Sequence, residues 1–168
     1  MEVQTVDAFV DYCQRIHYRT SRIIEVVPPE RLEWSYSPGK FTIGDIIRHI
    51  VGMERYMYAE IAAGRPNAYP GCKKELAEGF DNVWLYYRRL REESMQIFKG
   101  LTNEALLEKC TTPAGIQISV GKWLRAMIEH EIHHRAQLYT YLGLLEIKTP
   151  PIFGMTAEEV ASLSIVNK

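Results

Sequence analysis

The chain has 168 residues, of which 46% are hydrophobic and 24% are charged. These proportions are typical of a globular domain, and they exclude a disordered chain, a collagen-like chain and a coiled-coil rod. The 20 basic and 21 acidic residues leave a formal charge of −1, so the chain lacks the basic excess of most nucleic-acid-binding proteins. We therefore expect one domain over residues 1–168 and no nucleic-acid partner.

Three further features indicate a cytoplasmic protein. The cysteine count is three, an odd number, and no CxxC motif occurs, so we expect no disulfide framework and a reducing compartment. The first residues are acidic and contain no apolar segment of the kind found in secretory signals. No run of about 18 uncharged apolar residues is present, so we expect no membrane span.

The hydrophobic pattern predicts four long amphipathic helices. Apolar residues recur at spacings of three and four, which is the helical period, in four stretches: residues 5–27, 42–63, 73–98 and 119–142. Pro28 and Pro29 end the first stretch, and Gly64 ends the second. Thr42 is the predicted N-cap of the second helix, with Asp45 near the position that completes a capping box.

The segments between and after these helices predict only short elements. A helical piece is expected at about 103–109, and the uncharged segment 110–121 is expected to form a small hairpin or an extended loop. Thr156 is a plausible N-cap for a last short turn. Four amphipathic rods in one domain predict an all-α four-helix bundle, and the long linkers allow a crossover connection.

The fourth predicted helix carries the densest group of histidines, in the sequence EHEIHHR at 129–135. At about 100° per residue, His130 and His134 lie on the core side of the helix and His133 on its flank. Two imidazoles at i and i+4 can bind one metal ion. The alternative is a pair of core histidines hydrogen-bonded to neighbours. Burying both rings costs desolvation free energy unless each ring finds a partner, and this favours the metal.

The second predicted helix adds His49 on its apolar face. A single histidine there is more often a hydrogen-bonded core residue than a ligand. Together with His130 and His134, however, it would complete a three-histidine site. Three protein ligands leave at least one coordination position open, which is the pattern of catalytic metal sites.

The first predicted helix offers a competing pair, Cys13 and His17, also at i and i+4. The favoured interpretation is a buried thiol beside a histidine on the helix flank, with Cys13 kept as an accessory candidate. Cys110 lies in the uncharged segment, where no base is nearby in the sequence to activate it as a nucleophile.

Several charged residues are expected on solvated helix faces. Glu54, Glu60, Glu129 and Glu131 belong to this group, although one of them could accept a hydrogen bond from a histidine ring. The basic residues at 88–91 are mixed with acidic neighbours and are also expected to face solvent.

Residues 130–134 match the HExxH motif of zinc peptidases, in which Glu131 would be the general base. The metzincin extension of this motif is missing after Gln137, and the chain lacks the strands of the sheet that usually supports such sites. A zinc peptidase is therefore the weakest of the candidate functions.

Three parts of the sequence resemble the DinB-like family of four-helix bundles, which includes YfiT-like metal-dependent hydrolases and thiol-dependent S-transferases. They are WSYSPGKFT at 34–42 leading into IIRHI at 46–50, EHEIHHRAQL at 129–138, and GMTAEE at 154–159. The resemblance implies that His49, His130 and His134 are the metal ligands and that His133 is not. Ala136 stands where the family usually has glycine, which leaves the ligands intact.

The resemblance also implies what the protein does. A divalent metal, zinc or nickel, would activate a low-molecular-weight thiol of the bacillithiol or mycothiol type for S-transfer, or water for hydrolysis of a small-molecule substrate. Homodimers are common in the family. A second hypothesis is a non-catalytic, stress-related protein that binds a metal or a ligand, since the family takes its name from damage-inducible expression.

Overall fold

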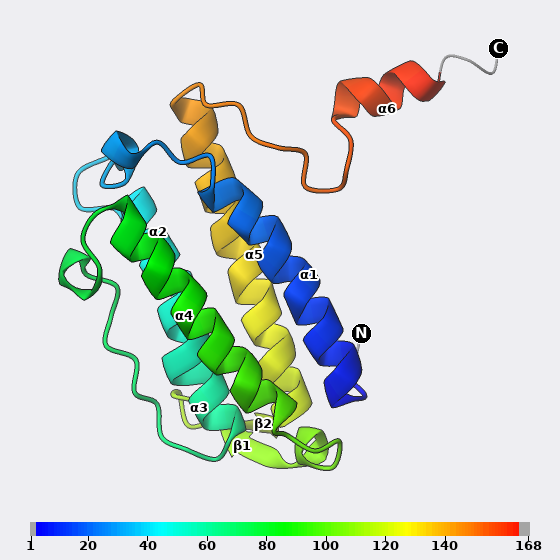
Figure 1. The fold of residues 1–168 in the computed structure, drawn as a ribbon. Coiled ribbons are helices and arrows are strands. Elements are labelled where there is room, and N and C mark those ends of the chain that lie inside the picture. The colour runs from blue at the N-terminus through cyan, green and yellow to red at the C-terminus, as the bar shows by residue number, and fades with distance from the viewer. Residues whose placement is uncertain (1–2, 165–168) are drawn as a thin grey trace.

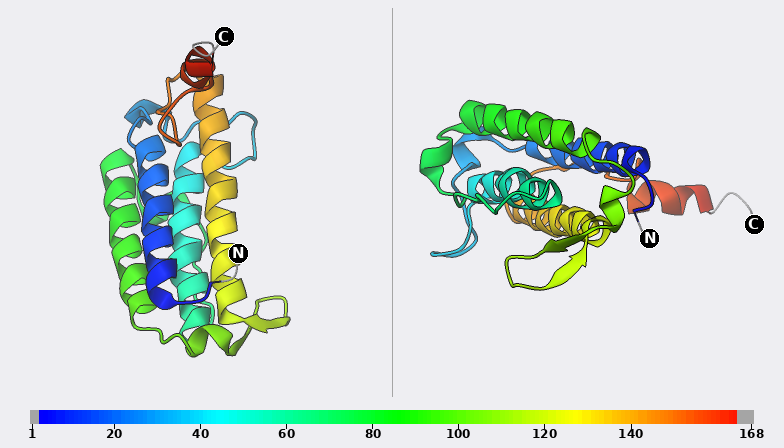
Figure 2. Two further views of the ribbon diagram at one scale, coloured as in Figure 1. Left: turned by 90° about the vertical axis from the view of Figure 1, so that its right-hand side faces the viewer. Right: turned by 90° about the horizontal axis from the view of Figure 1, so that it is seen from below.

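A computed structural model describes residues 3–164, and four long helical rods form its body (Figure 1). The rods are α1 (Val6–Ile24), the continuous run of α2 (Ile43–Met53), η2 (Glu54–Tyr58) and α3 (Ala59–Ala62), α4 (Phe80–Lys99) and α5 (Val120–Leu144). Figure 2 shows the same rods packed side by side from two further directions. The predicted all-α four-helix bundle is therefore confirmed.

The connections make this bundle different from a simple up-and-down one. α1 packs against α4 and α5, and α2 packs against the same two helices, so α1 and α2 are diagonal to each other. After α3, residues 63–79 run back along the outside of the bundle, so α2 and α4 are neighbours that point the same way (Figure 1). This is the crossover connection that the long linkers allowed.

The helix starts follow the capping residues of the sequence. The Thr42 side chain accepts from the backbone N–H of Asp45, and the Asp45 carboxylate accepts from the backbone N–H of Thr42, which is a complete capping box. At the start of α5, the Ser119 side chain accepts from the backbone N–H of Lys122. The expected helix at 73–98 was wrong at its start: η3 (Lys74–Leu76) precedes α4, and Gly79 separates the two with a φ of 79°, which interrupts the helix.

One feature inside the second rod was not predicted. Its five residues Glu54–Tyr58 form a π-helical turn, with α-helix on either side. A π turn inserts an extra residue into the helix, and such turns are frequent at functional sites. This one places Glu54 inside the bundle with only 2% of its surface exposed.

Two short elements connect α4 to α5. η4 (Ala105–Leu107) is followed by β1 (Lys109–Thr111) and β2 (Gln117–Ser119), which pair as an antiparallel hairpin with Cys110 opposite Ile118. Of the two forms expected for segment 110–121, the structure has the hairpin. After α5, the short helix α6 (Ala157–Ser164) begins at a capping box of Thr156 and Glu159.

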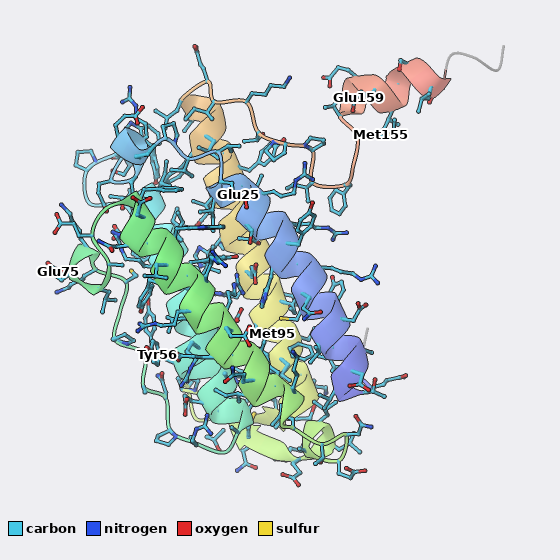
Figure 3. All side chains as sticks on the ribbon, viewed as in Figure 1. Glu25, Tyr56, Glu75, Met95, Met155 and Glu159 are labelled. Carbon is cyan, nitrogen blue, oxygen red and sulfur yellow. The ribbon has the colours of Figure 1, made fainter. Side chains whose placement is uncertain are left out.

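Side chains fill the space between the four rods, whereas those of α6, including Glu159, lie apart from them (Figure 3). The apolar core has two parts. In α1, the first part ends at Ile16 and the second begins at Ile23. His17 and Thr20 lie between the two parts and are buried, so a polar layer crosses the bundle at this level. No helix among residues 3–164 is long and apolar enough to cross a membrane.

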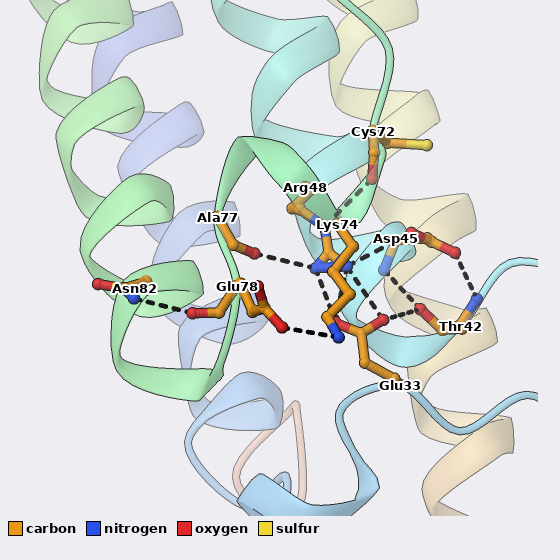
Figure 4. A network of polar contacts seen from close by, with 9 residues as sticks. All are labelled: Glu33, Thr42, Asp45, Arg48, Cys72, Lys74, Ala77, Glu78 and Asn82. Carbon is orange, nitrogen blue, oxygen red and sulfur yellow. Dashed lines mark hydrogen bonds and ion pairs between the residues drawn. The ribbon is translucent and has the colours of Figure 1, made fainter.

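A buried arginine attaches the outer loops to α2 (Figure 4). The Arg48 side chain is completely buried and donates hydrogen bonds to the Glu33 carboxylate and to the backbone carbonyls of Cys72 and Ala77. A Cβ atom at Gly44 would lie 2.8 Å from Arg48 Nη1, so glycine at this position leaves room for the guanidinium. Because Arg48 directly precedes His49 in the sequence, this network holds α2 in place next to His49.

Candidate metal centre

Three histidines from two helices converge on one point. His49 comes from α2, and His130 and His134 come from successive turns of α5. The Nε2 atoms of His49 and His130 are 3.0 Å apart, and each of the three rings offers a nitrogen within 4.8 Å of the others. Nitrogens that bind one zinc ion tetrahedrally at about 2.0–2.1 Å are about 3.3 Å apart. The three rings are therefore close to the geometry that a single divalent ion requires.

Two hydrogen bonds set the orientation of these rings. His134 Nδ1 lies 2.7 Å from the amide oxygen of Gln137, and His49 Nδ1 lies 2.7 Å from the hydroxyl of Tyr69. The Gln137 oxygen can only accept, so the proton of the His134 ring is on Nδ1 and Nε2 carries the lone pair. A donor bond from the second ring nitrogen is the usual support of a metal-binding histidine.

All three rings are neutral at pH 7. Burial lowers the pKa of His130 to about 3, with a further contribution from the neighbouring His134 and His49. Burial and His134 lower the pKa of His49 to about 4, and burial also lowers the pKa of His134. An imidazole binds a metal only in its neutral form, so the site is ready to accept a cation without first losing protons.

An open cavity of 590 Å³ adjoins the centre at His134. Its volume lies within the range of small-molecule sites. Tyr36, Phe41 and Tyr141 supply aromatic surface, and Gln137 and Lys40 supply polar groups. A small organic molecule in this cavity would lie next to the three-histidine cluster.

A second polar cluster lies in the buried layer of the bundle. Cys13 Sγ is 3.1 Å from His17 Nε2, and the same nitrogen is 3.0 Å from Glu54 Oε2. Arg91 forms ion pairs with both Glu54 and Glu131. Burial, with Glu54 and Glu131 nearby, raises the pKa of Cys13 well above its usual value, so this side chain is a protonated thiol.

This cluster corrects four expectations from the sequence. His17, Glu54, Glu131 and Arg91 were expected on helix flanks or solvated faces, yet each is less than 10% exposed. Their charges are balanced across helices, by partners far away in the sequence, and a helical pattern does not contain that information. Glu60 and the exposed Glu129 pair with arginines near them in the chain.

The structure does not support the peptidase hypothesis. Glu131 points into the buried layer, where it pairs with Arg91 and accepts a hydrogen bond from Thr20. A general base must be within hydrogen-bond reach of the water it activates. Glu131 is occupied by these partners and does not join His130 and His134.

Other candidates from the sequence lie away from the centre. His133 is exposed, as expected, and accepts a hydrogen bond from the Gln137 amide. Cys110 belongs to β1, beside the start of α5, and ten residues of helix separate Val120 from His130, or about 15 Å. Gln137 and Tyr69 were not predicted. Gln137 is detectable from its i+3 spacing to His134, whereas Tyr69 reaches the centre from a loop and leaves no local signal.

A comparison with protein families identifies the class. The DinB superfamily matches residues 13–138, which is most of the chain and includes all three histidines. The chain belongs to this superfamily. Among curated proteins, no match was found.

Solved structures of similar fold include three proteins from Bacillus. A DinB-like protein from Bacillus cereus is 18% identical, with a TM-score of 0.74, over 88% of this chain and 97% of that one. The DinB-like protein YjoA from Bacillus subtilis is 16% identical, with a TM-score of 0.72, over 86% and 97%. YfiT from Bacillus subtilis is 15% identical, with a TM-score of 0.67, over 88% and 91%. It is described as a probable metal-dependent hydrolase with an unusual four-helix bundle topology.

Proposed function

We propose that this protein is a divalent-metal-dependent enzyme in which His49, His130 and His134 bind the ion. The observation that carries the proposal is the convergence of three neutral imidazoles beside an open cavity. Ring nitrogens that face one another in a half-buried site cost folding free energy, and a shared ion removes that cost. The description of YfiT as metal-dependent supports the same type of chemistry in a protein of similar fold.

Zinc or nickel is the proposed ion, since three imidazole ligands suit either metal. When bound, such an ion supplies a Lewis acid that lowers the pKa of a thiol or a water molecule at its open position. The chain itself does the positioning. Gln137 holds the His134 ring in the tautomer that binds metal, and Tyr69 orients the His49 ring. Tyr36, Phe41 and Tyr141 offer surface on which an organic substrate can pack.

The proposed reaction is attack on a small electrophilic substrate, either by a low-molecular-weight thiol of the bacillithiol or mycothiol type or by water. The cavity beside His134 has room for a small molecule. No side chain within the described residues is assigned as a general acid or base, because the nearest carboxylate in the motif, Glu131, is occupied by Arg91.

Kinetics with zinc- and nickel-loaded protein test this proposal. Consumption of bacillithiol or mycothiol is followed in the presence of an alkylating electrophile, and ester and amide hydrolysis are followed without thiol. The proposal predicts turnover that disappears with His134→Ala and persists with Glu129→Gln, because Glu129 is exposed, pairs with Arg125 and lies outside both the cluster and the cavity. Binding of metal without turnover in either assay would favour the second hypothesis, a non-catalytic metal- or ligand-binding protein.

A further inference from the structure

A second group of metal-ligating side chains lies in the buried polar layer, apart from the three-histidine centre. Cys13 and His17 come from successive turns of α1, and Glu54 comes from the π turn η2. Each of the three offers a ligand atom within 4.8 Å of the others. Their separations are 3.1 Å for Cys13 Sγ to His17 Nε2 and 3.0 Å for His17 Nε2 to Glu54 Oε2.

An independent observation suggests that this group is incomplete. The second carboxylate oxygen, Oε1 of Glu54, is buried and has no hydrogen-bond partner among residues 3–164. Buried polar atoms in native proteins nearly always have a partner, and an unsatisfied one calls for an explanation such as a missing ion. The π turn that carries Glu54 is also a distortion of the kind that accompanies functional sites.

We propose that Cys13, His17 and Glu54 bind a second divalent cation inside the bundle, of the class that accepts thiolate, imidazole and carboxylate together, with zinc as the best fit. Zinc combines these three ligand types, and harder ions such as Mg²⁺ avoid thiolate. The Cys13 thiol loses its proton to solvent as the sulfur–metal bond forms, so no oxidant or reductant is needed. Tetrahedral ligands of zinc are about 3.3–3.6 Å apart, so the two pairs would open by about 0.3–0.5 Å.

The neighbouring cation, Arg91, can accommodate this ion. Its Nη1 donates a hydrogen bond of 2.8 Å to Glu131 Oε2, and its Nη2 lies within ion-pair distance of Glu131 Oε1, so Arg91 has Glu131 as a partner besides Glu54. Glu54 can therefore turn an oxygen to the metal while Arg91 stays paired with Glu131. The thiolate and the Glu54 carboxylate together offset the double charge of the ion.

A surface hollow reaches the edge of this cluster. His17 and Arg91 both line a surface hollow of 560 Å³ between α1 and α4. The His17 side chain keeps 11% of its surface exposed, whereas Cys13 is completely buried. An ion would enter past His17 and then meet Cys13 and Glu54.

Cobalt spectroscopy tests the proposal separately from the three-histidine centre. The test protein carries Cys72→Ser and Cys110→Ser, so Cys13 is its only thiol, together with His130→Asn and His134→Asn, which remove the first centre. Co²⁺ bound to a thiolate gives an intense charge-transfer band in the near ultraviolet, and Co²⁺ bound to imidazoles alone does not. The proposal predicts one Co²⁺ per chain with this band, and its displacement by Zn²⁺.

Absence of bound Co²⁺, or bound Co²⁺ without the thiolate band, would overturn the proposal and leave the cluster as a buried ion-pair network. Circular dichroism of the same protein checks that the bundle is folded. Adding Cys13→Ser is expected to abolish the band, but the conclusion does not depend on that variant, since the thiol is already unique. In protein with both centres intact, Cys13→Ser should remove one metal equivalent and leave the three-histidine equivalent, so failure of one site is distinguishable from failure of the other.

Discussion

Gln137 accepts a hydrogen bond from Nδ1 of His134 at a distance of 2.7 Å, one turn further along α5. The same amide donates to Nε2 of His133, which fixes the amide orientation. Both contacts are within one helix, so the ring of His134 is held in position before any ion arrives. Preorganisation of this kind is the usual role of the residues that surround metal ligands.

Removing this acceptor should weaken metal binding. Gln137→Leu is expected to lower the affinity for zinc by about 10- to 100-fold, the usual effect of losing a partner of a ligating histidine. Gln137→Glu keeps an oxygen acceptor and is expected to bind zinc at least as well as the wild type. Competition with a chromophoric chelator measures both affinities, and an unchanged affinity in Gln137→Leu would show that the contact does not support the site.

The metal-free protein should lose stability in mild acid. Burial lowers the pKa of His49 from 6.5 to about 4 and that of His130 to about 3. Between these values and 6.5, the unfolded chain binds protons that the folded chain does not, so stability rises with pH and falls as the pH drops from 6.5 towards 4.

Urea unfolding of metal-free protein at a series of pH values measures this effect. His130→Gln should lower the slope of unfolding free energy against pH by up to one proton, about 1.4 kcal/mol per pH unit. Acid-titrating carboxylates contribute to both proteins and cancel in the comparison. Equal slopes in the two proteins would mean that His130 is protonated alike in the folded and unfolded states.

The Arg48 network should be a large contributor to stability. The side chain is fully buried, and Arg48→Met would leave two backbone carbonyls without their donor, whereas the Glu33 carboxylate keeps 34% of its surface exposed and its hydrogen bond from Thr42. A buried acceptor left unsatisfied costs about 1–3 kcal/mol, so a loss of at least this order is expected. Thermal or urea unfolding measures the loss, with the exposed Arg89→Met expected within about 0.5 kcal/mol of the wild type. A similar small effect at Arg48 would contradict the role given to the network.

Glu131 should matter for folding and not for the three-histidine centre. Glu131→Gln removes one of the two carboxylate charges that pair with Arg91 in the buried layer, so a loss of about 1.5–3 kcal/mol is expected. The exposed Glu129→Gln is the matched control and should be near neutral. In a Cys13→Ser background, both variants should keep one zinc per chain by elemental analysis. Loss of that zinc with Glu131→Gln alone would place Glu131 at the metal after all.

Local sequence patterns predicted most of the fold and most of the three-histidine centre. The spacing of apolar residues located the four rods, and the i, i+4 spacing placed His130 and His134 on the inward face of one helix, because both depend only on helix geometry. Capping at Thr42 and Thr156 was likewise visible, since a cap is formed within three residues. Periodicity also placed His49 on the apolar face of the second helix as a possible third ligand, and the family resemblance implied the same three residues.

The rest depended on contacts between distant parts of the chain. On sequence alone, Glu54 and Arg91 were expected to face solvent because each is charged. In the structure, they pair with each other between two helical rods inside the bundle. Tyr69 supports His49 from a loop twenty residues away, at a position that no period predicts. The π turn at Glu54 and the late start of α4 at Phe80 were also missed. The homodimer and the identity of the ion stay predictions.

The most direct test of the central claim is the metal content of untagged protein after loading with zinc or nickel, measured by elemental analysis. Wild type, His49→Ala and His133→Ala are compared. The account predicts that His49→Ala holds one metal equivalent fewer than the wild type, because His49 is the only ligand of the centre supplied by α2, and that His133→Ala holds the same amount as the wild type. Equal metal content in all three proteins would contradict a centre built from His49, His130 and His134.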